Sequence, residues 1–143
     1  MYALYDALGR RPASVMWTAL LTMAVGGATL VCSSVLVTAL VTSWPGLVFW
    51  GVAVVQLGAG GLLVVGGVRL VMGSGRWETA AGAALLYLTC GAYVLYAMTE
   101  VAGNPQDERL VPALLTIAGA FAAAGTGVLV LAMRVAGRTV VAR

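Results

Sequence analysis

Polar side chains at helical spacing are the residues of this sequence that could do chemistry. An α-helix turns by 100° per residue, and at this period one set of polar residues forms a narrow stripe along one side. The set consists of Thr89, Tyr93, Tyr96 and Glu100. A second set falls within about 60° of arc and consists of Thr18, Thr22, Thr29 and Ser33. Two hydroxyl stripes with a carboxylate at one end predict a polar path for an ion or a small substrate. The alternative, which we favour, is that these hydroxyls bond their own helix or a neighbouring one.

Gln56 is the one strongly polar side chain near the middle of an apolar segment. Its amide needs hydrogen-bond partners in lipid, where water does not supply them. We therefore expect Gln56 to specify a helix–helix or subunit contact, in preference to binding a substrate.

Several chemistries are excluded because the sequence contains no histidine and no lysine. Their absence removes imidazole bases and ligands, Schiff-base lysines and the phosphate-binding lysine of a P-loop. We expect no catalytic residue, no cofactor and no metal site. The two cysteines, Cys32 and Cys90, fall on the expected helices at heights of about 25 and about 16 Å, at 1.5 Å per residue. That difference exceeds the reach of a disulfide, so two free, buried thiols that act as small apolar residues are expected.

The apolar segments that carry these residues have the length of membrane spans. Of 143 residues, 62% are hydrophobic and 9% charged, against roughly 45–50% and about 25% in soluble domains. A spanning helix needs about 20 apolar residues. Segments of that kind cover residues 15–41, 47–70, 79–99 and 110–133. They are apolar throughout, which indicates helices and excludes the alternating strands of a barrel. The sequence predicts an all-α membrane protein in which residues 1–143 form one small bundle of four transmembrane helices.

The charged residues predict how this bundle is oriented. Seven of the eight arginines fall on one side of the membrane and are Arg10, Arg11, Arg69, Arg76, Arg134, Arg138 and Arg143. Arg109 falls on the other side, beside Glu100, Asp107 and Glu108. The positive-inside rule then places both termini in the cytoplasm.

Glycines on the segment 47–70 lie on two faces. Gly51 and Gly58 share one face, with Gly61 and Gly66 flanking them. Gly60 and Gly67 lie on the opposite face together with Gln56. Small residues let membrane helices approach closely. Two glycine faces predict packing on both sides of this helix, within the bundle and against something outside it. The alternative is that glycine is simply abundant in membrane helices.

The segment 110–133 has a small face and a bulky face. The small face contains Gly119, Ala122, Ala123, Thr126 and Gly127. We expect it to pack on protein. The bulky ridge contains Leu114, Ile117, Phe121 and Val128, and we expect it to meet lipid or a partner. Pro112 lies inside this segment and predicts a kink.

The composition, with arginine in place of lysine and abundant alanine, glycine and valine, resembles that of small four-helix membrane proteins of high-GC actinobacteria. The resemblance covers composition and topology. Such proteins include accessory subunits of lipid importers of mammalian-cell-entry type and of respiratory supercomplexes. It implies a non-catalytic accessory subunit that docks on, stabilises or regulates a larger inner-membrane complex, for example a lipid transport system. The expected partners are other integral membrane subunits and the lipid bilayer, with no nucleic acid. The alternative is a small oligomeric transporter or channel.

Overall fold

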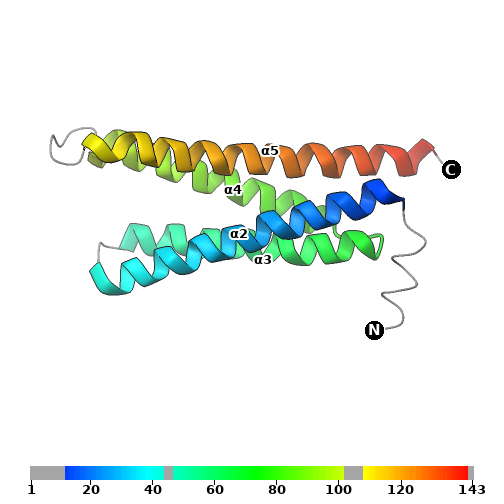
Figure 1. The fold of residues 1–143 in the computed structure, drawn as a ribbon, viewed down its shortest axis with the longest axis horizontal. Coiled ribbons are helices and arrows are strands. Elements are labelled where there is room, and N and C mark those ends of the chain that lie inside the picture. Colours follow the sequence, from blue (N-terminus) through cyan, green and yellow to red (C-terminus); the bar gives the residue numbers. More distant parts are fainter. Residues whose placement is uncertain (1–11, 44–46, 102–107, 142–143) are drawn as a thin grey trace.

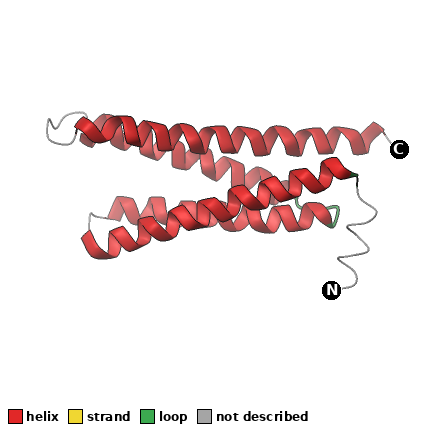
Figure 2. Ribbon diagram, viewed as in Figure 1, coloured by secondary structure: helices red, strands yellow, loops and turns green. Residues whose placement is uncertain are grey.

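The structure is a computed structural model and consists mainly of long helices (Figure 1). The structure describes residues 12–43, 47–101 and 108–141, except the side chains of residues 43, 100, 101, 108 and 136–141. The elements are α2 (Ala13–Ser43), α3 (Leu47–Val71), α4 (Arg76–Tyr96) and α5 (Val111–Val141), with the π-helical η1 (Ala97–Val101) and the 3-10 helix η2 (Glu108–Leu110). Within these described ranges no residue is in a strand, as Figure 2 shows.

Four helices are long and apolar enough to cross a membrane, which confirms the predicted fold class. The segments that meet this condition are Ala13–Thr42, Leu47–Val71, Arg76–Thr99 and Val111–Val135. The helices extend beyond the predicted spans, most of all α5, which continues from residue 133 to Val141. A charged residue ends an apolar segment but does not end a helix, because arginine is a good helix former.

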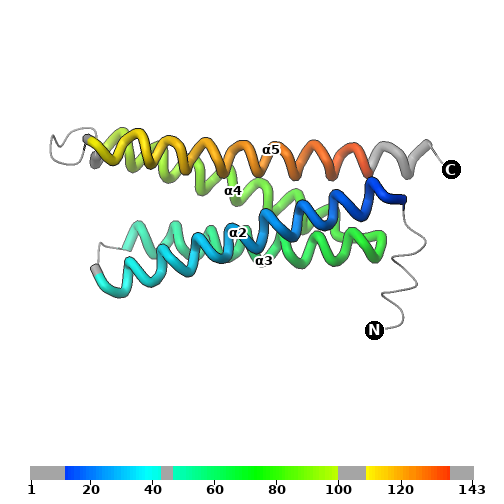
Figure 3. The backbone as a smooth tube through the Cα atoms, viewed as in Figure 1, coloured from blue at the N-terminus to red at the C-terminus, as the bar shows by residue number. Residues whose placement is uncertain are grey.

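The helices are arranged in chain order and run up and down, as the backbone trace shows (Figure 3). α3 packs against α2 and α4, and α4 packs against α3 and α5, whereas the contact between α2 and α5 is much smaller than these three. The start of α2, the turn between α3 and α4, and the part of α5 around Arg134 lie at one end of the bundle (Figure 1). We call this end the arginine end, because Arg69 and Arg76 lie there as well.

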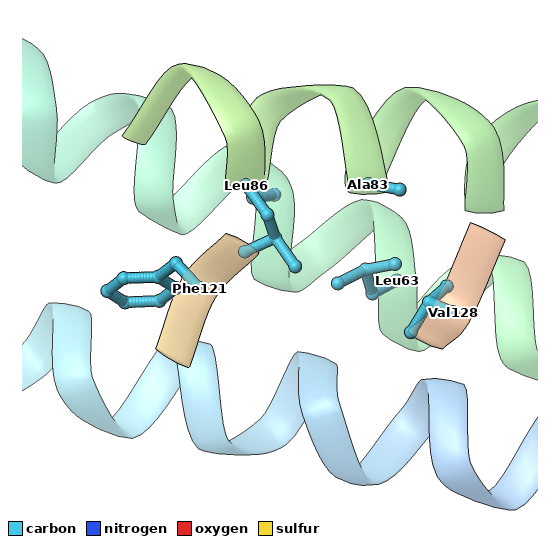
Figure 4. Packing of buried hydrophobic residues seen from close by; sticks show 6 residues of the cluster. Leu63, Ala83, Leu86, Phe121 and Val128 are labelled. Carbon is cyan, nitrogen blue, oxygen red and sulfur yellow. The ribbon is translucent and has the colours of Figure 1, made fainter. Parts of the chain in front are cut away.

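The main apolar core lies between α3, α4 and α5. Its buried members are Ala59, Leu63, Ala83, Leu86, Phe121 and Val128 (Figure 4). A smaller cluster joins α2 to α3 near the arginine end through Ala19, Leu70 and Val71. The buried face of α2 is otherwise made largely of small and hydroxyl residues, so α2 lies close to the backbone of α3.

The turn between α3 and α4 is closed by backbone hydrogen bonds and one ion pair. Gly73 has a φ of 90° and its N–H donates to the carbonyl of Leu70, while Ser74 N–H donates to the carbonyl of Arg69. This pair of bonds is a Schellman motif, in which the left-handed position favours glycine. Arg69 in the last turn of α3 forms an ion pair with Glu78 in the first turn of α4. The hairpin is thereby tied at the arginine end.

The predicted kink at Pro112 is wrong. Pro112 is the second residue of α5 and therefore lies in its first turn. A proline there interrupts no hydrogen bond of the helix, because the first amides have no partner within it.

Candidate functional sites

The clearest polar contact inside the bundle joins Gln56 of α3 to Tyr93 of α4. Gln56 is 1% exposed, and its Nε2 donates to the Tyr93 hydroxyl at 3.2 Å. Gln56 Oε1 is buried without a hydrogen-bond partner among the described residues. On its other side, the Tyr93 ring lies nearly parallel to that of Phe121 of α5, with ring centroids 6.0 Å apart. Tyr93 therefore connects α3, α4 and α5 at one level of the bundle.

The other residues of the predicted polar path on α4 have separate partners. The hydroxyl of Thr89 donates to the carbonyl of Leu85 at 3.0 Å. The ring of Tyr96 meets Phe49 edge-on, with centroids 4.7 Å apart. The side chain of Glu100 lies outside the described residues. Within the described part, Thr89, Tyr93 and Tyr96 form no hydrogen bonds with one another.

The hydroxyl stripe of α2 is buried and bonded to its own helix. Each hydroxyl donates to the carbonyl four residues earlier, at 2.7–2.8 Å, and the four donors are Thr18, Thr22, Thr29 and Ser33. Such bonds satisfy the hydroxyl locally. The stripe thus follows the interpretation that we favoured.

Close contact between α2 and α3 is made by glycines from both helices. A Cβ atom on Gly60 would lie 2.7 Å from Leu30 Cγ and 3.0 Å from the carbonyl oxygen of Gly26. A Cβ atom on Gly67 would lie 2.5 Å from Met23 Cγ. The face that carries Gly60, Gly67 and Gln56 is therefore turned into the bundle.

The opposite glycine face of α3 is closed at Gly66, where a Cβ atom would lie 2.6 Å from Thr79 Oγ1 of α4, and open elsewhere. No described atom lies within 4 Å of a Cβ built on Gly51 or Gly61, and one built on Gly58 would make an ordinary contact of 3.5 Å with Leu85. Gly51 and Gly58 are exposed. The open part of this face, at Gly51 and Gly61, is free to contact lipid or another protein.

The orientation of α5 differs from the predicted one in most of its residues. Two observations agree with the prediction: Ile117 of the bulky ridge is exposed, and the Thr126 hydroxyl of the small face is hydrogen-bonded to the Tyr87 hydroxyl of α4. Phe121 and Val128 of the bulky ridge are 8% and 2% exposed and belong to the core. The small residues Gly119, Ala123 and Gly127 are exposed, and no described atom lies within 4 Å of a Cβ on either glycine.

The physical reason lies on the facing helix. On α4, Tyr93 presents a ring on which Phe121 stacks, with centroids 6.0 Å apart, and Leu86 lies in the same core (Figure 4). α5 comes close to α4 at Gly125, where a Cβ atom would lie 3.4 Å from the carbonyl oxygen of Ala83 and 3.5 Å from Leu86 Cβ. The stacking and this close approach turn Phe121 and Val128 into the core. The prediction used the residues of one helix alone, whereas the packing depends on the residues of both α4 and α5.

Sequence reasoning missed three contributors. Gly26 and Gly82 are packing glycines, with a Cβ on Gly82 only 2.7 Å from Leu63 Cγ. The third is a groove of about 200 Å³ at the arginine end, between α2 and α5. It is lined mainly by apolar side chains, with Arg134 among them. The sequence shows a glycine pair at 26–27, and it shows Trp17 and Arg134 at the ends of apolar segments. It does not show which helices meet, so neither contact could be assigned.

The remaining candidate groups for chemistry are the two cysteines and the acidic side chains. Cys32 and Cys90 are both free, as predicted, but they are not buried as predicted: Cys32 is exposed and Cys90 is half-buried. Within the described ranges, no three His, Cys, Asp or Glu side chains are grouped so that they could hold a metal ion.

Comparison of the chain with known protein families, curated proteins and solved structures finds no match in any of the three. The fold itself defines a class, that of multi-pass helical membrane proteins with four spanning helices.

Proposed function

We propose that the chain is a non-catalytic accessory subunit that docks on a larger complex in a bacterial cytoplasmic membrane. The observation that carries this proposal is the small-residue stripe on the outer face of α5, formed by Gly119, Ala123 and Gly127. These positions follow one another at four-residue intervals and lie within about 80° of arc.

The energetic argument concerns what such a stripe contributes in lipid. Glycine destabilises a helix interior by about 1 kcal/mol relative to alanine. Between helices, small residues let two backbones approach closely, and this close packing drives association where no hydrophobic effect acts. Inside this chain the stripe on α5 makes no such contact with the described residues. A transmembrane helix of another subunit supplies the contact that these positions fit.

A second surface supports docking on more than one side. Gly51 and Gly61 of α3 are also open, while Gly60 and Gly67 on the inner face hold α2. The helix that uses glycine to build the bundle thus presents glycine outside it as well. A subunit of an assembly needs glycine contacts inside its own bundle and glycine contacts with other subunits. A chain surrounded only by lipid needs only the contacts inside its bundle.

The resemblance in composition to accessory subunits of actinobacterial lipid importers supports a lipid transport system as one such complex. The excess of arginine on one side supports an orientation with both termini in the cytoplasm.

The alternative of a small transporter receives less support. The hydroxyls of α2 are bonded to their own backbone, and those of Thr89 and Tyr93 have separate partners. These groups are satisfied without a substrate.

Purification of the tagged protein from its native membrane in a mild detergent tests the proposal. We expect a stoichiometric integral membrane partner, which Gly119→Leu and Gly127→Leu release. The matched control is Gly91→Leu on α4, where the position is exposed and no described atom lies within 4 Å of a Cβ. It should retain the partner. Recovery of the wild type as a clean monomer or homo-oligomer would sink the proposal.

A further inference from the structure

The groove between α2 and α5 at the arginine end combines apolar walls with one cation. Its volume is about 200 Å³, and its lining includes Ser14, Trp17 and Leu21 of α2 with Leu131, Arg134 and Val135 of α5. α2 and α5 pack against each other least of all neighbouring helices, and the groove lies where their ends approach (Figure 1). It is therefore a gap in the contact between the first and the last helix.

Arg134 is exposed at this groove and has no ion-pair partner among the described residues. By contrast, Arg69 at the same end is paired with Glu78. Arg134 lies in the last turn of the apolar segment Val111–Val135, so its guanidinium sits where hydrocarbon gives way to headgroups. A cation at that depth attracts the phosphate of a lipid, and the planar guanidinium can bind two phosphate oxygens at once.

We propose that this groove binds an anionic phospholipid, with an acyl chain along its apolar wall and the phosphate on Arg134. Basic pockets between transmembrane helices are recognised sites for anionic headgroups. The groove is too small for another transmembrane helix, which with side chains is about 10–12 Å across. A single acyl chain is narrow enough to enter. This site is separate from the stripe of Gly119, Ala123 and Gly127 and does not depend on a protein partner.

Trp17 supplies a built-in probe, because it lines the groove and is 66% exposed. The chain is reconstituted with Trp17 as its only tryptophan, after Trp44, Trp50 and Trp77 are each changed to Phe. Its fluorescence is then quenched by phosphatidylglycerol or by phosphatidylcholine that carries bromine on one acyl chain. We expect about fivefold stronger association for phosphatidylglycerol, the preference that one basic residue near the membrane surface gives.

Arg134→Gln should abolish this preference, and Arg134→Lys should retain part of it, because lysine keeps the charge and loses the bidentate geometry. The matched control is the chain whose only tryptophan is Trp77. That residue is at the same end and 82% exposed, and it does not line the groove. Its quenching should not change with Arg134→Gln. Raising the salt concentration should weaken the preference at Trp17.

Equal quenching of Trp17 by the two lipids overturns the proposal, and so does a preference that survives Arg134→Gln. The measurement uses the chain alone in bilayers, so its result is independent of whether the accessory-subunit proposal holds.

Discussion

Gly26 of α2 and Gly60 of α3 face each other so closely that neither position has room for a side chain. A Cβ atom on Gly26 would lie 2.9 Å from the carbonyl oxygen of Gly60 and 2.9 Å from the backbone nitrogen of Val64. Both obstacles are backbone atoms, which cannot move aside as the end of a side chain can. The approach of these two helices therefore depends on glycine at this crossing.

We predict that Gly26→Ala destabilises the protein by about 1–3 kcal/mol, the cost of overpacking a well-packed site. Gly27→Ala is the matched control, because no described atom lies within 4 Å of a Cβ there. It should be neutral or stabilise by up to about 1 kcal/mol, since alanine is the better helix former. Unfolding of both variants in detergent measures the difference. Equal stability of the two would show that α2 and α3 do not cross at Gly26.

The hydrogen bond between Gln56 and Tyr93 predicts that the cost of replacing Tyr93 depends on whether Gln56 is present. Tyr93→Phe leaves a buried amide without its remaining partner and should cost about 1–3 kcal/mol. In a Gln56→Leu background the same change should cost much less, because the buried amide is gone. A double-mutant cycle gives the coupling, expected at about 0.6–2 kcal/mol for an interhelical bond in a membrane. A coupling near zero would contradict the contact.

The orientation of α5 can be tested with two bulky residues on different faces. Phe121→Ala removes a core side chain and should destabilise the bundle by about 3 kcal/mol. Ile117→Ala, at a position that is 43% exposed, should change stability by less than about 0.5 kcal/mol. Thermal unfolding in the same detergent compares them. A loss for Phe121→Ala as small as that for Ile117→Ala would support the orientation expected from the sequence, in which both side chains face away from the core.

The arrangement of arginines predicts the side on which each end lies. A fluorescent protein that matures only in the cytoplasm should fluoresce when fused after Arg143. Alkaline phosphatase, which is active only outside, should be inactive at that position. The control is phosphatase inserted between α4 and α5, which should be active. Activity at the C-terminus and none in the insertion would reverse the predicted orientation.

The sequence was sufficient to predict the helices and insufficient to predict how α5 is turned. Span lengths follow from hydropathy because every backbone group in lipid must be bonded within its own segment. That constraint acts on one helix at a time and so can be read from the chain. The inward turn of Phe121 depends instead on Tyr93 of another helix, on whose ring it stacks. No periodicity within residues 110–133 contains that information.

The same distinction, between features set by one helix and features set by a pair of helices, applies to the candidate sites. The inward face of Gly60 and Gly67 was visible as one stripe, although its partners Gly26 and Met23 were not. For the hydroxyls of α2, the local bond to the carbonyl four residues earlier needs no knowledge of a neighbour. The groove at Arg134 could not be predicted, because it exists only through the approach of the first helix to the last.

The packing of each helix mainly on the next one in the chain has a consequence for the order of synthesis. α3 can pack on α2 as soon as it has left the ribosome, and α4 and α5 can each join a surface that is already present. No helix has to wait in the bilayer for a partner made two helices later. The contact between α2 and α5 forms last and is the smallest, so assembly is nearly complete before the chain ends are brought together.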